Sequence, residues 1–146
     1  MNVPFRRLCP EAREPRRAHT GDAGYDLHSV NGLTLAPGGR ALVRTGISVA
    51  IPGGYAGLVL PRSGLAVRHG VSLVNTPGLI DSGYRGEIQV PLINHDREAS
   101  FEVTPGMRVA QLVFVRAAEA DFLEVELLEE GLDGRGEGGF GSSGTG

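Results

Sequence analysis

The stretch RALVRTGISVAI, Arg40 to Ile51, indicates the fold class, because β-branched and apolar residues dominate it and Pro52-Gly53-Gly54 ends it. Two later runs have the same character: Tyr55 to Leu60 and GEIQVPLIN, Gly86 to Asn94. Runs of this length and composition, bounded by turn residues, predict short β-strands connected by tight turns.

The same alternation of strand-like runs and turns continues toward the C-terminus. Ser100 to Thr104 and Met107 to Val115 are predicted strands, and Phe122 to Leu127 is a further candidate. The best helix candidate is one or two turns at Ser63–Arg68. Short strands at this spacing predict an all-β fold, a jelly-roll-like barrel or sandwich.

Length and composition are typical of one globular domain. The chain has 146 residues, 40% of them apolar, and it lacks Trp, so the core is expected to consist mostly of Val, Leu, Ile and Ala. We predict a β-barrel domain over residues 1–128. Residues 129–146 are predicted to form a linker and a glycine-rich C-terminal arm.

Charge, hydropathy and cysteine content argue against several classes of partner. The net charge of −3 argues against binding to nucleic acid. No apolar run approaches the length of a membrane span and no secretory signal is recognisable, so neither membrane insertion nor secretion is expected. A single cysteine, Cys9, cannot form an intramolecular disulfide, which fits a reducing compartment and predicts a cytoplasmic location.

The last residues of the chain, Arg135 to Gly146, are rich in glycine, and Phe140 is their one large apolar side chain. A backbone without side chains can approach a ligand closely and present N–H groups to it. With Arg135 and the hydroxyl of Ser142, this composition suits a ligand that has a flat ring and phosphates. The alternative for such a composition is a disordered Gly/Ser tail.

Two internal segments combine turn residues with charged side chains. Ala23-Gly-Tyr-Asp-Leu27 contains Asp26, which at such a position is either a turn former or a ligand. Pro61-Arg-Ser-Gly-Leu65 marks the end of a strand and the start of the predicted helix. Ser63 is there either a helix N-cap or, together with Arg62, part of an anion site.

Two further segments place polar residues within apolar runs. VNTPGLIDSGYRGEI, Val74 to Ile88, is predicted to form a hairpin with turns at its Pro-Gly and Ser-Gly pairs. Asp81 follows two apolar residues at the end of a short strand, either as a turn cap or as a functional carboxylate. RVAQLVF, Arg108 to Phe114, is a predicted strand in which Gln111 requires hydrogen-bond partners if it is buried.

In this order, the four internal segments and the tail resemble the five motifs of the trimeric dUTP pyrophosphatases (dUTPases), over essentially the whole chain. The resemblance implies a jelly-roll subunit and a threefold homotrimer, in which active sites lie between subunits and are closed by a neighbour's C-terminal arm. It also implies hydrolysis of dUTP to dUMP and pyrophosphate with Mg²⁺, by attack of water on the α-phosphorus. That reaction limits uracil incorporation into DNA and supplies dUMP for dTMP synthesis.

The resemblance also implies a role for each matching residue. Asp81 is expected to orient and deprotonate the attacking water, and Gln111 to hydrogen-bond near the α-phosphate. Asp26 is expected to contact, through water, a Mg²⁺ that the triphosphate itself mainly ligates. The residues expected to bind the phosphates are Arg62, Ser63, Gly64, Arg135 and Ser142. Those expected to bind the base and sugar are Asn75, Leu79, Ile80, the backbone of Asp81, Tyr84, Gln89, Phe140 and Gly141.

Three other functions are weighed against this one. A dCTP deaminase shares the fold, but its glutamate would stand five residues after Gly86, where this chain has Pro91, which cannot transfer a proton. A non-catalytic nucleotide-binding or regulatory protein on the same scaffold would be expected to lack Asp81 or the arm. A structural β-trimer would not require polar residues at so many strand ends.

Overall fold

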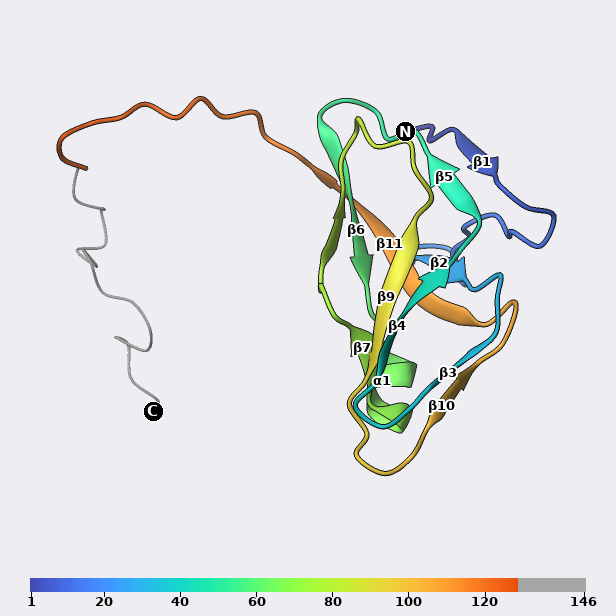
Figure 1. Cartoon of the computed structure of the whole chain (residues 1–146). Helices are drawn as coiled ribbons and strands as arrows, with labels where there is room; N and C mark the ends of the chain where they lie inside the picture. Colours follow the sequence, from blue (N-terminus) through green and yellow to red (C-terminus); the bar gives the residue numbers. More distant parts are fainter. Residues whose placement is uncertain (129–146) are drawn as a thin grey trace.

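A computed structural model describes residues 1–128 of the chain as a sandwich of two antiparallel β-sheets. The four-stranded sheet has the order β2-β11-β6-β8, with bounds Tyr25–His28, Arg108–Arg116, Tyr55–Leu60 and Gly78–Ile80. The three-stranded sheet has the order β4-β9-β7, with bounds Arg40–Arg44, Gln89–Asn94 and Val71–Leu73. Two ribbons extend these sheets: β1 (Phe5–Arg7) with β5 (Ile47–Val49), and β3 (Leu33–Leu35) with β10 (Phe101–Val103). The all-β jelly-roll prediction is confirmed (Figure 1).

The hydrophobic core lies between the two sheets, and alternating side chains of their strands fill it. In β9, Val90 and Leu92 are fully buried while their neighbours along the strand are more exposed. Val59 and Leu112 contribute from the four-stranded sheet. This alternation is the period-2 pattern of a strand with one face against a core. The one helix among residues 1–128, α1 (Ser63–His69), begins three residues after β6 and ends near the position predicted for it.

The run Arg40 to Ile51 forms two strands in different sheets rather than one continuous strand. The chain leaves β4 at Thr45 and Gly46 and continues as β5. Gly46 has a φ of 66°, and a Cβ there would press against Cys9 and Ala12. A side chain at this corner would therefore be both conformationally strained and too large for the available space.

The prediction that Val74 to Ile88 forms a hairpin is wrong. Strand β8 pairs with β6, so that Leu58 stands opposite Leu79, while β9 pairs with β4 and β7. The segment therefore crosses from one sheet to the other and back again. Turn residues signal that a chain changes direction, but they do not determine which strand becomes the hydrogen-bonded neighbour.

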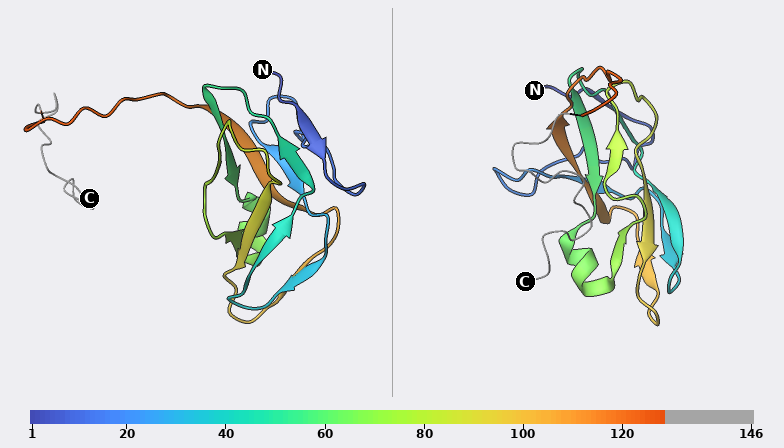
Figure 2. Two further views of the ribbon diagram at one scale, coloured as in Figure 1. Left: turned by 45° about the horizontal axis from the view of Figure 1, so that its top comes forward. Right: turned by 90° about the vertical axis from the view of Figure 1, so that its left-hand side faces the viewer.

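The predicted strand at Phe122 to Leu127 is also wrong, because residues 117–128 contain no strand. After β11 this part of the chain leaves the body of the domain and has no neighbouring strand to pair with (Figure 1 and the left view of Figure 2). Its apolar side chains are highly exposed, with Phe122 at 101% and Leu127 at 85%. Residues 129–146, which contain the predicted linker and arm, lie outside the described part of the chain.

We expect Leu92→Ala to reduce the free energy of unfolding by about 2–5 kcal/mol, because it removes a fully buried side chain and leaves a cavity. Leu42→Ala is the matched control, since Leu42 lies on the neighbouring strand β4 and is 55% exposed. Urea unfolding of both variants at one protein concentration measures the difference. Equal losses of stability in the two variants would contradict the assignment of the core.

Candidate functional site

The first candidate site is a cleft of about 460 Å³ beside the ends of β6 and β11. It brings together residues that are far apart in the sequence, as the motifs predict. Those of its lining residues that the sequence singled out are Asp26, Arg62, Ser63, Gly64 and Gln111, and Arg108 joins them. Both charged and neutral hydrogen-bond donors therefore face one concave surface, which is the composition of an anion site.

Asp26 is the electrostatic centre of this cleft and lies on strand β2, not in a turn. One carboxylate oxygen is 3.2 Å from Nε of Arg62, and the other accepts a hydrogen bond of 3.0 Å from Arg108. The Asp26 side chain is only 15% exposed, so these two guanidinium groups compensate a carboxylate that is largely removed from water. The lining as a whole includes a second carboxylate, Asp22, so two arginines and two aspartates face the cleft, and the donors that an anion could bind are the guanidinium groups around Asp26.

Gln111 lies on β11 with its side chain against the segment that connects β6 to α1. Its Nε2 donates a hydrogen bond of 3.0 Å to the carbonyl oxygen of Pro61. This bond supplies the partner that the sequence required for a half-buried amide. A Cβ at Gly24 would overlap the Gln111 amide oxygen, so the glycine of the first motif allows the glutamine to lie against the backbone.

Of the two alternatives for Ser63, the helix start at the cleft contradicts the N-cap. Arg62 occupies the N-cap position without a side-chain cap bond, and Ser63 is the first helical residue. The Ser63 hydroxyl is therefore not used as a cap, and it lines the cleft instead.

A second, smaller cleft of about 230 Å³ contains the residues expected to bind base and sugar. Its lining residues are Leu79, Ile80, Asp81, Tyr84, Glu87 and Gln89. Asp81 directly follows β8, as the sequence predicted, and it is exposed. Asn75 is not among these residues and lies instead along a neighbouring groove with Val74 and Pro91.

The two clefts are separate within one subunit, as the register of β6 shows. Gln111 pairs with Leu60 at the end of β6, whereas Ile80 pairs with Gly57. Because β8 and β6 are antiparallel, Asp81 lies one residue beyond this pair, toward the start of β6. Asp81 and Gln111 are therefore offset by roughly 13 Å along β6 and by two strand spacings across it, or roughly 16 Å between backbones. That separation is too large for both side chains to act on one phosphorus atom.

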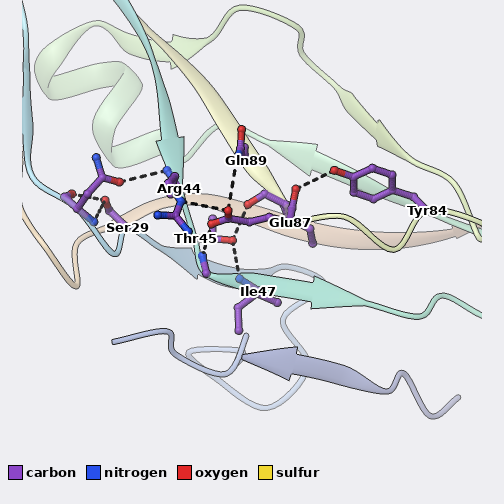
Figure 3. Close-up of polar contacts among 10 residues, drawn as sticks. Ser29, Arg44, Thr45, Ile47, Tyr84, Glu87 and Gln89 are labelled. Carbon is purple, nitrogen blue, oxygen red and sulfur yellow. Dashed lines mark hydrogen bonds and ion pairs between the residues drawn. The ribbon is translucent and has the colours of Figure 1, made fainter. Parts of the chain in front are cut away.

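Glu87 is a residue of the second cleft that no motif of the sequence indicated (Figure 3). Its carboxylate accepts hydrogen bonds from the Gly46 N–H at 2.8 Å and from Arg44 at 3.1 Å, and the Gln89 amide lies at 3.4 Å. Burial raises the pKa of Glu87, but these hydrogen bonds outweigh it and hold the pKa below its ordinary value of 4.5.

His28, on β2 beside the first cleft, has a buried Nδ1 without a hydrogen-bond partner among the described residues. Burial and the nearby Arg13 lower its pKa below the ordinary value of 6.5. Neutral His28 therefore adds no charge next to Asp26.

Among residues 1–128, no cluster of three or more His, Cys, Asp or Glu side chains could hold a metal ion. The same residues include no helix with the length and hydropathy needed to cross a membrane.

A β-sandwich with a cleft that presents two arginines and a separate cleft containing an aspartate and a tyrosine has the features of a protein that acts on a phosphorylated ligand. The family model described as dUTPase matches residues 11–144. The chain therefore belongs to the dUTPase family.

Two sequence relatives are both named deoxyuridine 5'-triphosphate nucleotidohydrolase. The protein from Thermobifida fusca is 54% identical over 144 residues, which cover 99% of this chain and 79% of the relative. The protein from Mycobacterium tuberculosis (strain CDC 1551 / Oshkosh) is 56% identical over 141 residues, which cover 94% of this chain and 92% of the relative.

Two solved structures have the same fold. The dUTPase of Staphylococcus bacteriophage 80alpha, determined with dUPNHPP, aligns with a TM-score of 0.90 and 32% identity over 99% of both chains. A mutant dUTPase of phage phi11 of S. aureus aligns with a TM-score of 0.82 and 28% identity over 87% of this chain and 98% of the phage chain. That structure describes the coordination of a structural Mg(II) ion.

We expect Glu87→Gln to lower the melting temperature at neutral pH by a few degrees, since a hydrogen bond to a charged group contributes about 1.5–3 kcal/mol. Because the pKa of Glu87 is lowered by folding, its contribution is fully present above pH 4.5 and is lost as the pH falls through the folded-state pKa.

Thermal unfolding of wild type and variant between pH 3 and pH 7 measures this effect. Plotted against pH, the melting temperatures of wild type and Glu87→Gln should converge as the pH falls. Glu102→Gln, at an exposed position of β10, is the matched control. A difference that is independent of pH would contradict the role of the ionised carboxylate.

Proposed function

We propose that this chain hydrolyses dUTP to dUMP and pyrophosphate, which limits uracil incorporation into DNA and supplies dUMP for dTMP synthesis. The observation that carries this proposal is the dUTPase family match over residues 11–144, which spans both clefts. The phage relative bound to dUPNHPP supports a deoxyuridine nucleotide as the ligand.

Asp81 is the proposed general base. It takes a proton from a water molecule whose oxygen forms a bond to the α-phosphorus, while the bond from that phosphorus to the bridging oxygen breaks and pyrophosphate leaves. An exposed carboxylate at the end of β8 is accessible to such a water. Gln111, contributed from the first cleft, donates a hydrogen bond to the α-phosphate.

The phosphates are proposed to bind in the first cleft to Arg62, the Ser63 hydroxyl and the Gly64 N–H. Arg62 contacts Asp26 in the structure, so an incoming phosphate competes with that carboxylate for the guanidinium group. Arg135 and Ser142 are proposed to complete the phosphate contacts from the arm, and both lie outside the described residues.

The residues of the first cleft fit a Mg²⁺ that the triphosphate mainly ligates. Asp26 is the acidic residue that we propose to contact the ion through water, and among residues 1–128 no cluster could supply a full set of protein ligands. Such partial coordination suits Mg²⁺, which retains several waters. When bound, the ion neutralises phosphate charge.

Base and sugar are proposed to occupy the second cleft. Backbone groups of Leu79, Ile80 and Asp81 pair with the uracil edge, with Gln89 beside them, in a pocket too narrow for a 5-methyl group. Asn75, which lines the neighbouring groove, is proposed to contact the same edge. The Tyr84 ring packs under the deoxyribose. Phe140 and Gly141 of the arm, outside the described residues, are proposed to cover the base.

We propose a homotrimer with shared active sites, and the separation of the two clefts within one chain supports it. One subunit cannot bring Asp81 and Gln111 to one phosphorus atom, whereas a neighbouring copy can supply the missing half. The exposed apolar side chains of residues 122–128, such as Phe122 and Leu127, support contact with another subunit. We place the catalytic domain at residues 1–128, the closing arm within 129–146, and the protein in the cytoplasm, as the unpaired Cys9 suggests.

We expect pyrophosphate release with Mg²⁺ from dUTP and little from dTTP, dCTP or UTP. Asp81→Asn, and a chain that ends before Arg135, should each lose at least about 100-fold in kcat, in the range seen when catalytic groups are removed. Release of ammonia from dCTP would point instead to a deaminase. Binding of dUTP without turnover would leave a regulatory nucleotide-binding protein.

We further expect that two inactive variants, Asp81→Asn and Arg62→Ala, regain activity when an equimolar mixture is refolded together. If each site takes Asp81 from one subunit and Arg62 from another, about a quarter of the sites in random trimers contain both wild-type residues. Either variant refolded alone is the control. No recovery in mixed trimers would place both residues of each site in the same subunit.

A further inference from the structure

The ring of Tyr84 lies over the backbone of Gly86, in space that any side chain at position 86 would occupy. A methyl group on Gly86 would overlap the phenol oxygen of Tyr84 and lie only 2.9 Å from its Cε2. The Tyr84 hydroxyl also donates a hydrogen bond of 2.9 Å to the carbonyl oxygen of Glu87 (Figure 3). We call these two features, the empty side of Gly86 and the Glu87 carbonyl, the Tyr84 seat.

The Tyr84 seat is important for the orientation of the Tyr84 ring, because the ring is partly exposed to solvent. Tyr84 is 43% exposed, so core packing does not fix its orientation. The Glu87 carbonyl, in contrast, belongs to a well-anchored stretch of backbone. The Glu87 carboxylate is bound by Gly46 and Arg44, and the adjacent carbonyl of Ile88 accepts a hydrogen bond of 2.6 Å from the buried Thr45 hydroxyl.

We infer that Gly86 is a positioning residue that determines sugar specificity by seating Tyr84 as a fixed wall of the sugar site. This inference rests on the proposed function, in which the Tyr84 ring packs under the deoxyribose and leaves no space for a 2′-hydroxyl. The Tyr84 ring can exclude a ribonucleotide by its 2′-hydroxyl only if the ring is held in place. A side chain at position 86 would displace the Tyr84 ring from the Glu87 carbonyl, and the ring would then be free to change its orientation.

The test compares kcat/KM for dUTP and for UTP in wild type and Gly86→Ala. We expect the ratio of kcat/KM for dUTP to kcat/KM for UTP to fall by at least about tenfold in Gly86→Ala, in the range that a single steric contact contributes to discrimination. The loss should be mainly a lower KM for UTP and a higher KM for dUTP, with a smaller change in kcat, because Asp81 is not displaced. An unchanged ratio overturns the inference.

Gly83→Ala is the matched control for a glycine substitution in the same loop. A Cβ at Gly83 would have open space around it, and the φ of Gly83 lies outside the left-handed region. The ratio of kcat/KM for dUTP to that for UTP should therefore remain at the wild-type value. Thermal unfolding of both variants reports whether the fold is kept. If Gly86→Ala does not fold, Tyr84→Phe tests the same seat, because it removes only the hydroxyl that binds Glu87. A wild-type ratio in Tyr84→Phe then overturns the inference.

A double-mutant cycle separates seating of the ring from a general effect on the backbone. In a Tyr84→Ala background the ring is absent, so Gly86→Ala should change the ratio no further. A further loss of similar size would show that Gly86 acts through the backbone, and it would overturn the inference. Wild-type protein that does not hydrolyse dUTP would refute the proposed function itself, whereas hydrolysis with a ratio unaffected by Gly86→Ala would refute only the seat.

Discussion

Strand β6 is hydrogen-bonded along both edges, and the rest of the site depends on this constraint. On one edge β11 places Gln111 opposite Leu60, near the end of β6, and on the other β8 places Ile80 opposite Gly57. The register of a paired strand is specified by its whole buried face, because a shift of one residue would turn every core side chain outward. The first and second clefts therefore lie at different levels of one sheet, and for this reason the proposed site combines residues of two subunits.

The corner between β4 and β5 anchors the segment that contributes Glu87 to the second cleft. At that corner the Gly46 N–H binds the Glu87 carboxylate and the Thr45 hydroxyl binds the Ile88 carbonyl, so the segment before β9 is attached to the opposite strand at two points. Hydrogen bonds to a partly buried, ionised carboxylate stabilise the fold and also hold the backbone groups that form them in one conformation. Tyr84, which is exposed, obtains its orientation from this anchored backbone.

The charge pattern of the first cleft also depends on long-range contacts. Asp26 comes from β2, Arg62 from the residue before α1 and Arg108 from the start of β11, and they meet because β2 and β11 are neighbours. The arginines stabilise the carboxylate in the absence of a ligand and remain available to an anion. Both basic residues of the cleft are arginines, as expected in a chain whose 14 basic residues include no lysine.

The sequence alone determined the all-β class, strand β6, the helix near Ser63, the position of Asp81 at a strand end and the family, because these depend on local composition and on the order of short motifs. It did not reveal the separation of Arg40 to Ile51 into two strands, the pairing of β8 with β6, or Glu87 as part of the second cleft. Phe122 to Leu127 read as a strand because its composition suits one, yet a strand also requires a neighbour. Only the tertiary structure decided these points, because strand partners and side-chain contacts are set by residues distant in the sequence, which local patterns do not encode.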